Sequence, residues 1–122
     1  MLATHIDVIL YVTGGITATM FSLFLAPETY LRLVNKIESA DEFTLFLARH
    51  WGFVIGLFGV LMIWAGYDPA IRTPIIASTA VGKGVLVVMI LMNIKSFGKG
   101  FTHVAIFDSL CALVFFAYLA GL

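Results

Sequence analysis

Four long apolar runs, joined by short polar connections, dominate this chain and leave few folds open to it. Each run holds about 20 residues with little charge, which is the length an α-helix needs to cross the hydrocarbon core of a bilayer. Over the whole chain 61% of the residues are apolar and 11% are charged, against about 25% charged in an ordinary soluble domain. The sequence therefore predicts an all-α integral membrane protein.

Turn and capping residues set the limits of the predicted spans. Pro27 ends the first run, and Ser39 with Glu42 matches a capping box before the second. The glycine-rich stretch from Ser96 to Gly100 predicts a turn, and Thr102 after it is a suitable N-cap for the last run. We predict a four-transmembrane-helix bundle, a single domain over residues 1–122, with spans at residues 6–26, 40–66, 74–94 and 103–119.

The first connection contains a helical pattern of its own. From Glu28 to Ile37, apolar and polar side chains recur at helical spacing, which predicts a short helix lying in the membrane interface. The basic residues gather at the first and third connections, and the positive-inside rule places those connections in the cytoplasm. Both termini are then expected outside. The basic residues on the predicted cytoplasmic side are Arg32, Lys36, Arg49, Lys95 and Lys99, with Arg72 on the other side.

Small residues recur on the first two spans at spacings that bring them to one face of each helix. Such stripes let helix backbones approach closely inside a membrane. We interpret them as packing within the bundle, and docking onto another protein is the alternative that the sequence leaves open. The predicted packing residues are Gly14, Ala18 and Ser22 on the first span and Gly52, Gly56 and Gly59 on the second.

Lys83 is the most unusual residue of the third span, because it lies near the middle, between Gly82 and Gly84. A charged side chain at that depth costs about 2.5 to 3.5 kcal/mol on insertion, so we expect it to have a partner. The fourth span supplies Asp108. By helical rise, Lys83 lies about 18 Å and Asp108 about 9 Å from the cytoplasmic end, a gap that the lysine stem can bridge. We predict that the two pair inside the bundle, directly or through water.

Three further polar residues fall in the predicted cytoplasmic half of the bundle. Glu28 ends the first span, Arg49 shares a helix face with the glycine stripe, and His50 follows it. With Lys83 and Asp108 they could form one polar cluster. The sequence leaves three interpretations open: an ion-pair network that fixes helix register, a ligand or lipid-headgroup site, and a proton-coupled path.

Motifs for catalysis and metal binding are missing from the sequence. It contains no nucleophile elbow, phosphate loop or zinc pattern, so we do not predict an enzyme or a metal site. Haem between His50 and His103 is disfavoured, because neither has a second ligand at helical spacing, and we expect no cofactor. The zero net charge gives no basis for nucleic-acid binding. Cys111, the single cysteine, cannot form an internal disulfide.

Two stretches carry a family resemblance, namely Ala26-Pro27-Glu28-Thr29 and Ala48-Arg49-His50-Trp51-Gly52, followed by Gly56 and Gly59. In these residues the chain resembles the small DoxX-like four-helix membrane proteins, in particular bacterial families labelled as domains of unknown function. It lacks the early His-Gly and Lys pair of the DoxX pattern and its acidic residue in the second span, which argues against DoxX-type oxidoreductase activity. The resemblance implies a four-helix fold in a bacterial inner membrane and implies no reaction.

Three functions remain open at this point. Short connections and the lack of a catalytic motif favour a non-catalytic accessory subunit of a larger membrane assembly, with the bilayer and other membrane subunits as partners. The charged residues favour a stand-alone bundle that binds a lipid or quinone beside Lys83 and Asp108. A proton-coupled transporter, acting as an oligomer, comes third, because no inverted repeat or broken helix is evident. We favour the accessory subunit, since a structural ion pair explains the charges without a ligand.

Overall fold

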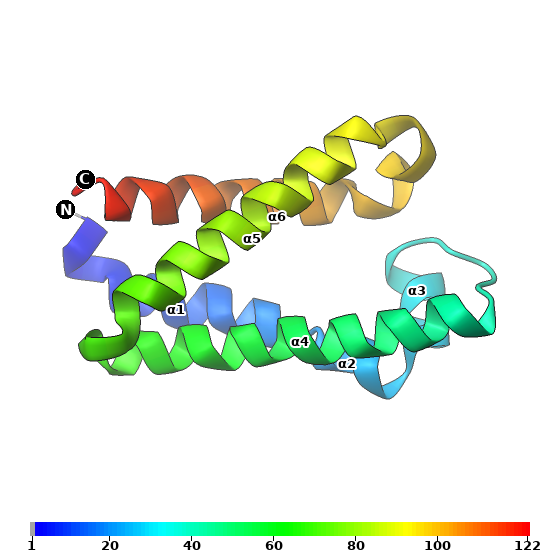
Figure 1. Cartoon of the computed structure of the whole chain (residues 1–122), viewed down its shortest axis with the longest axis horizontal. Coiled ribbons are helices and arrows are strands. Elements are labelled where there is room, and N and C mark those ends of the chain that lie inside the picture. Colours follow the sequence, from blue (N-terminus) through cyan, green and yellow to red (C-terminus); the bar gives the residue numbers. More distant parts are fainter. Residues whose placement is uncertain (1) are drawn as a thin grey trace.

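The protein is a bundle of helices, seen here in a computed structural model that describes residues 2–122 apart from the side chain of Phe97. Every regular element in that range is helical. Four helical stretches are long and apolar enough to cross a membrane, which confirms the prediction of an all-α chain with four such helices: Leu2–Leu25, Glu42–Tyr67, Pro69–Met92 and Gly98–Leu119. The elements are α1 (Leu2–Ala18), α2 (Phe21–Leu25), α3 (Pro27–Val34), α4 (Glu42–Tyr67), the 3-10 helix η1 (Pro69–Ile71), α5 (Arg72–Met92) and α6 (Ile94–Leu119) (Figure 1).

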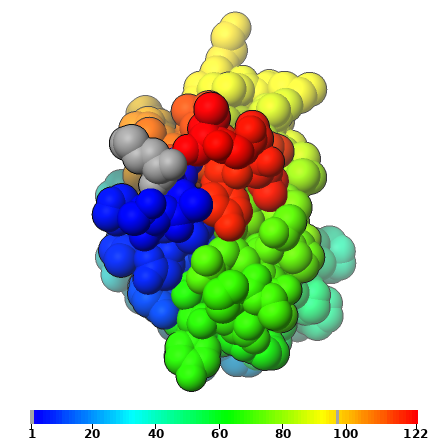
Figure 2. All heavy atoms as spheres, turned by 90° about the vertical axis from the view of Figure 1, so that its left-hand side faces the viewer, coloured from blue at the N-terminus to red at the C-terminus, as the bar shows by residue number. Residues whose placement is uncertain are grey.

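The helices are arranged as two pairs. α1 and α2 pack along α4, and α5 packs along α6. The pairs meet at the end of the molecule that holds both chain termini and lie farther apart at the other end (Figure 1). Figure 2 looks onto the first end, where the start of α1, the end of α4 and the end of α6 form one closed surface. The buried core lies in this half, with two residues from each long helix: Ile6, Leu10, Met62, Ala65, Ile76, Ala80, Cys111 and Phe115.

The first predicted span is interrupted where α1 gives way to α2. The backbone amides of Thr19 and Met20 bond to the carbonyls three residues earlier, at 3.1 Å each, instead of four residues earlier. Just before this point, the hydroxyls of Thr13 and Thr17 donate to carbonyls of their own helix at 2.7 and 2.8 Å. Such bonds bend helices. The stretch Leu2–Leu25 still has the length and composition of one span.

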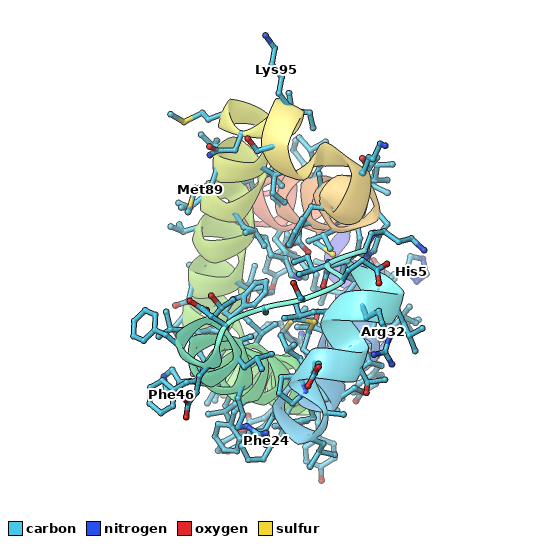
Figure 3. The ribbon with its side chains drawn as sticks, turned by 90° about the vertical axis from the view of Figure 1, so that its right-hand side faces the viewer. His5, Phe24, Arg32, Phe46, Met89 and Lys95 are labelled. Atoms are coloured by element: carbon cyan, nitrogen blue, oxygen red, sulfur yellow. The ribbon has the colours of Figure 1, made fainter. Side chains whose placement is uncertain are left out.

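A short helix, α3, occupies most of the segment in which we expected one. Pro27 stands in its first turn, where its missing N–H costs nothing. The helix ends at Asn35, which is buried and donates from its side chain to the Gly100 carbonyl at 2.9 Å. Any Cβ at Gly100 would overlap the backbone of Asn35. Figure 3, seen from this end, shows α3 and residues 35–41 between the two helix pairs, with Arg32, Phe46 and Lys95 pointing outward on different sides.

The capping residues predicted for the second and fourth spans differ from those in the structure. The second long helix is capped by Asp41, whose carboxylate accepts from the Thr44 amide at 2.8 Å, and not by Ser39. The hydrogen bonds from Thr44 hold the pKa of Asp41 below its ordinary value of 3.8. Aspartate accepts hydrogen bonds from the free amides of a first turn at least as well as serine does, and its negative charge interacts favourably with the positive end of the helix dipole.

The fourth long helix begins at Ile94 instead of His103, so the predicted turn from Ser96 to Gly100 is helical. Thr102 is not an N-cap, because its hydroxyl donates to the Gly98 carbonyl inside the helix. Of the two glycines in this stretch, Gly100 serves close packing, because it lies against the backbone of Asn35. The chain therefore turns at Asn93, where only a tight connection separates α5 from α6.

Candidate functional site

Lys83 and Asp108 form a direct ion pair between α5 and α6. The Lys83 Nζ lies 2.9 Å from the Asp108 Oδ1, and the two side chains are only 10% and 8% exposed. The predicted pairing is confirmed, without the water that we left open. Because α6 begins at Ile94, Asp108 lies about 21 Å of helical rise from the start of its helix, well inside the bundle and not close to a helix end.

The Lys83 ammonium has three donors, and three groups surround it. The Asp108 carboxylate takes one, the Thr17 hydroxyl accepts at 3.3 Å, and the face of the Phe107 ring lies 4.8 Å away, measured to its centroid. Thr17 in turn donates to the carbonyl of Thr13, so its hydroxyl both donates and accepts a hydrogen bond. The ammonium is therefore closed in by its own protein. An ion pair held this way fixes the register of α5 against α6 and ties both to α1.

The other three members of the predicted polar cluster do not join it. Glu28, Arg49 and His50 are all exposed, and over residues 2–122 no hydrogen bond or ion pair is found between any of them and Lys83 or Asp108. Arg49 donates from Nη1 to the Phe24 carbonyl at 3.0 Å, at the end of α2. Within residues 2–122, the polar contacts found around the ion pair come instead from Thr17 on α1 and from the pair itself on α5 and α6.

The predicted glycine stripes do face each other. A Cβ added to Gly14 would lie 2.8 Å from the Gly59 carbonyl oxygen, and one added to Gly59 would overlap the backbone of Ala18. At Gly52 and Gly56 an added Cβ would lie 2.8 Å from Leu23 and 2.7 Å from Phe21. Packing within the bundle therefore accounts for these stripes.

Ser22 is the exception among the predicted packing residues. Its side chain is exposed. The turn between α1 and α2 changes the direction of the helix after Ala18, so a residue four positions later no longer faces α4.

The two glycines beside Lys83 have a different environment. A Cβ at Gly82 would meet no described atom within 4 Å, and one at Gly84 would touch only Phe116, at 3.9 Å. These two glycines therefore do not serve a close approach of α5 to a neighbouring helix beside the Lys83 stem. Gly84 instead opens a shallow apolar groove of about 420 Å³ on the outside of the pair, lined by Val81, Gly84, Val85, Val88, Met89 and Phe116.

Sequence reasoning missed Arg72 as a structural residue. Its Nε and Nη2 donate to the carbonyls of Ala65 and Gly66 at 2.9 and 3.0 Å, so it closes the last turn of α4 from the first residue of α5. An arginine just after a span was read only as a topology signal. The cluster of Asp68, Pro69 and Arg72 in so short a connection is the signal that could have indicated a capping role.

Metal and cofactor binding find no support in the described part of the chain. No three His, Cys, Asp or Glu side chains among residues 2–122 come together in a way that could hold a metal ion. His50 on α4 and His103 on α6, the two histidines considered for haem, are both exposed. Searches against family models, curated proteins and solved structures returned no match for this chain. The resemblance to DoxX-like proteins therefore rests on the residues quoted above.

Proposed function

We propose that this protein is a non-catalytic subunit of a larger membrane assembly, and that the outer face of α5 binds a helix of another subunit. The observation that supports this proposal most directly is Gly82, which is exposed and where an added Cβ would meet no described atom of another helix within 4 Å. Glycine inside a helix costs about 1 kcal/mol relative to alanine. Gly14, Gly52 and Gly59 offset that cost through close contact with a facing helix. A partner helix packed against Gly82 would offset it in the same way.

The surroundings of Gly82 fit such a contact. Ser78 lies one turn earlier on α5 and is also exposed, so two small residues share the face at a spacing of four. The groove beside Gly84 adds an apolar surface that a bulky side chain of a partner can fill. Met89, at one end of this groove, points away from the bundle in Figure 3.

The ion pair also favours a structural role. A quinone carbonyl or a lipid phosphate beside this pair would need a free donor, whereas a carboxylate, a hydroxyl and an aromatic ring already surround the Lys83 ammonium. A proton-coupled path has less support still, because Glu28, Arg49 and His50 do not continue the pair toward one end of the bundle.

The proposal includes a place in the cell. The resemblance to DoxX-like proteins and the four apolar helices favour a bacterial inner membrane. Five basic residues at the α3 end favour a cytoplasmic location for that end, with α3 lying in the interface and both termini outside. A reporter fused after Leu122 and a tag inserted within residues 37–40 are expected to report opposite compartments. The same compartment for both would contradict this topology.

The subunit proposal is tested by mild solubilisation of native membranes and native mass spectrometry of the full chain. We expect companion proteins in fixed stoichiometry, lost when Gly82→Leu blocks the α5 face. Gly15→Leu on α1 is the control for the added bulk alone, because a Cβ there also meets no described atom within 4 Å, but Gly15 is only partly exposed and the residue one turn earlier is the large Tyr11. This variant is expected to keep the companions. A monomer or dimer that carries only lipid, or companions that survive Gly82→Leu, would contradict the proposal.

A further inference from the structure

Thr79 is a buried polar residue with an unused hydroxyl. Its side chain is on the inner face of α5 and the residue is only 4% exposed. Over residues 2–122 its Oγ1 is the buried side-chain nitrogen or oxygen that lacks a hydrogen-bond partner. Buried polar groups are nearly always bonded, to protein or to ordered water, because an unmade bond loses the solvation of the group. Thr79 therefore needs an explanation.

A threonine inside a helix normally solves this problem by itself. Thr13, Thr17 and Thr102 each donate to the carbonyl four residues earlier in their own helix. The Thr79 hydroxyl does not use the equivalent carbonyl of Ile75. The hydroxyl is thus left for a partner outside its own backbone.

The position of Thr79 suggests that partner. It lies one turn before Lys83 on α5, and α6 runs antiparallel to α5 (Figure 1). Because the helices are antiparallel, one turn back from Lys83 to Thr79 on α5 corresponds to one turn forward from Asp108 on α6. The residues opposite Thr79 are therefore Cys111 and Ala112. Both are small and buried, at 3% and 7% exposed. Small side chains opposite Thr79 leave more room beside its hydroxyl than leucine or phenylalanine would.

Asp108 offers a charged acceptor one helical turn along α6 from the residues that lie opposite Thr79 by register. A carboxylate can accept about four hydrogen bonds, and the Lys83 ammonium occupies one of its oxygens, Oδ1. We propose that one ordered water molecule is bound between α5 and α6, accepting from the Thr79 hydroxyl and donating to the Asp108 carboxylate. The water completes the bonding of Thr79 and gives the carboxylate a second donor. It would be a second polar link between α5 and α6, after the ion pair of Lys83 with Asp108.

The first test removes the hydroxyl while keeping the shape of the side chain. Thr79→Val in the full chain, purified in nanodiscs, is expected to lower Tm by roughly 3 to 6 °C, because the water and both of its bonds are lost. If the Thr79 hydroxyl made no hydrogen bond, its burial would destabilise the protein, and its removal would raise Tm. An unchanged or raised Tm overturns the proposal.

The second test separates a bound water from a bond within α5. In the background Lys83→Met with Asp108→Leu the water has lost its acceptor, so Thr79→Val is expected to leave Tm unchanged or raise it. An equal fall in both backgrounds would mean that Thr79 bonds to its own helix, and it overturns the proposal. Thr13→Val is the matched control, since its hydroxyl donates to Ile9, and its effect is expected to be the same in both backgrounds.

A direct observation covers the case in which the altered background does not fold. An experimental structure of the unaltered chain, at a resolution that shows ordered water, is expected to hold density within hydrogen-bond distance of both the Thr79 Oγ1 and an Asp108 carboxylate oxygen. Well-defined density for both side chains with nothing between them overturns the proposal.

Discussion

The two helix pairs are held together by different forces. Between α1, α2 and α4 lies a glycine seam, formed by Gly14, Gly52, Gly56 and Gly59, in which backbone meets backbone or a side chain at van der Waals distance. Between α5 and α6 lies a charged seam, centred on the ion pair of Lys83 and Asp108. The glycines of α5, Gly82 and Gly84, make no close backbone contact there. Close packing tolerates no added atom, whereas an ion pair tolerates the loss of both charges better than the loss of one. The two seams should therefore respond to mutation in opposite ways.

The largest effect is expected when one charge of the charged seam is removed. Asp108→Leu should destabilise the protein by about 3 to 5 kcal/mol, because it leaves the Lys83 ammonium buried without a counter-charge. The double variant Lys83→Met with Asp108→Leu should recover most of this loss, since neither charge remains. Unfolding equilibria of the two single variants and the double variant in nanodiscs give the coupling free energy. Simple additivity would show that the two residues do not interact.

A smaller effect is expected from a single methyl group in the glycine seam. Gly59→Ala should cost about 1 to 3 kcal/mol, because the new Cβ overlaps the backbone of Ala18 and a backbone cannot turn aside. Gly82→Ala is the matched control on the other pair and should be neutral or stabilise by up to about 1 kcal/mol. Thermal unfolding of the isolated chain measures both. Equal losses at the two positions would remove the distinction between the seams.

Arg72 connects the two pairs, and its loss should have an intermediate to small effect. Arg72→Met should cost about 1 to 2 kcal/mol, because the carbonyls of Ala65 and Gly66 lose a charged donor. Arg72→Lys should restore only part of this, since an ammonium cannot present the two donors of the guanidinium in the same fixed geometry. Hydrogen exchange at the end of α4 should increase in step with the loss of stability. Unchanged exchange there would contradict the capping role.

The smallest effect concerns the start of α4 and depends on pH. Thr44 lowers the pKa of Asp41 in the folded protein, so the ionised carboxylate favours folding at pH values above its ordinary pKa of 3.8. That contribution is lost as the pH falls through the lowered value. Asp41→Asn keeps a cap that does not titrate. The difference in Tm between the two proteins should therefore be constant from pH 7 to about pH 5 and should change below about pH 4. A constant difference throughout would exclude a role for the charge.

The sequence by itself determined the class of fold, because four apolar runs of span length can only be helices in a bilayer or a buried bundle. It also determined the glycine seam, since small residues at spacings of three and four allow close helix packing in a membrane. It determined the pairing of Lys83 with Asp108 as well, since a charge in the middle of a span needs a partner. These features depend on periodicity within one helix, or on the high cost of leaving a group unpaired.

The tertiary structure decided which other residues the pair touches and which it excludes. Thr17 and Phe107 reach Lys83 because α1 and α6 converge on α5, and no spacing along the chain encodes that convergence. Helical geometry directed Arg49 toward the bundle interior, but its guanidinium bonds to the carbonyl of Phe24, which is available because α2 ends at Leu25. Contacts between helices depend on the angles at which the helices cross and on where each helix is interrupted. Both arise from the packing of the whole chain, so no single segment of the sequence encodes them.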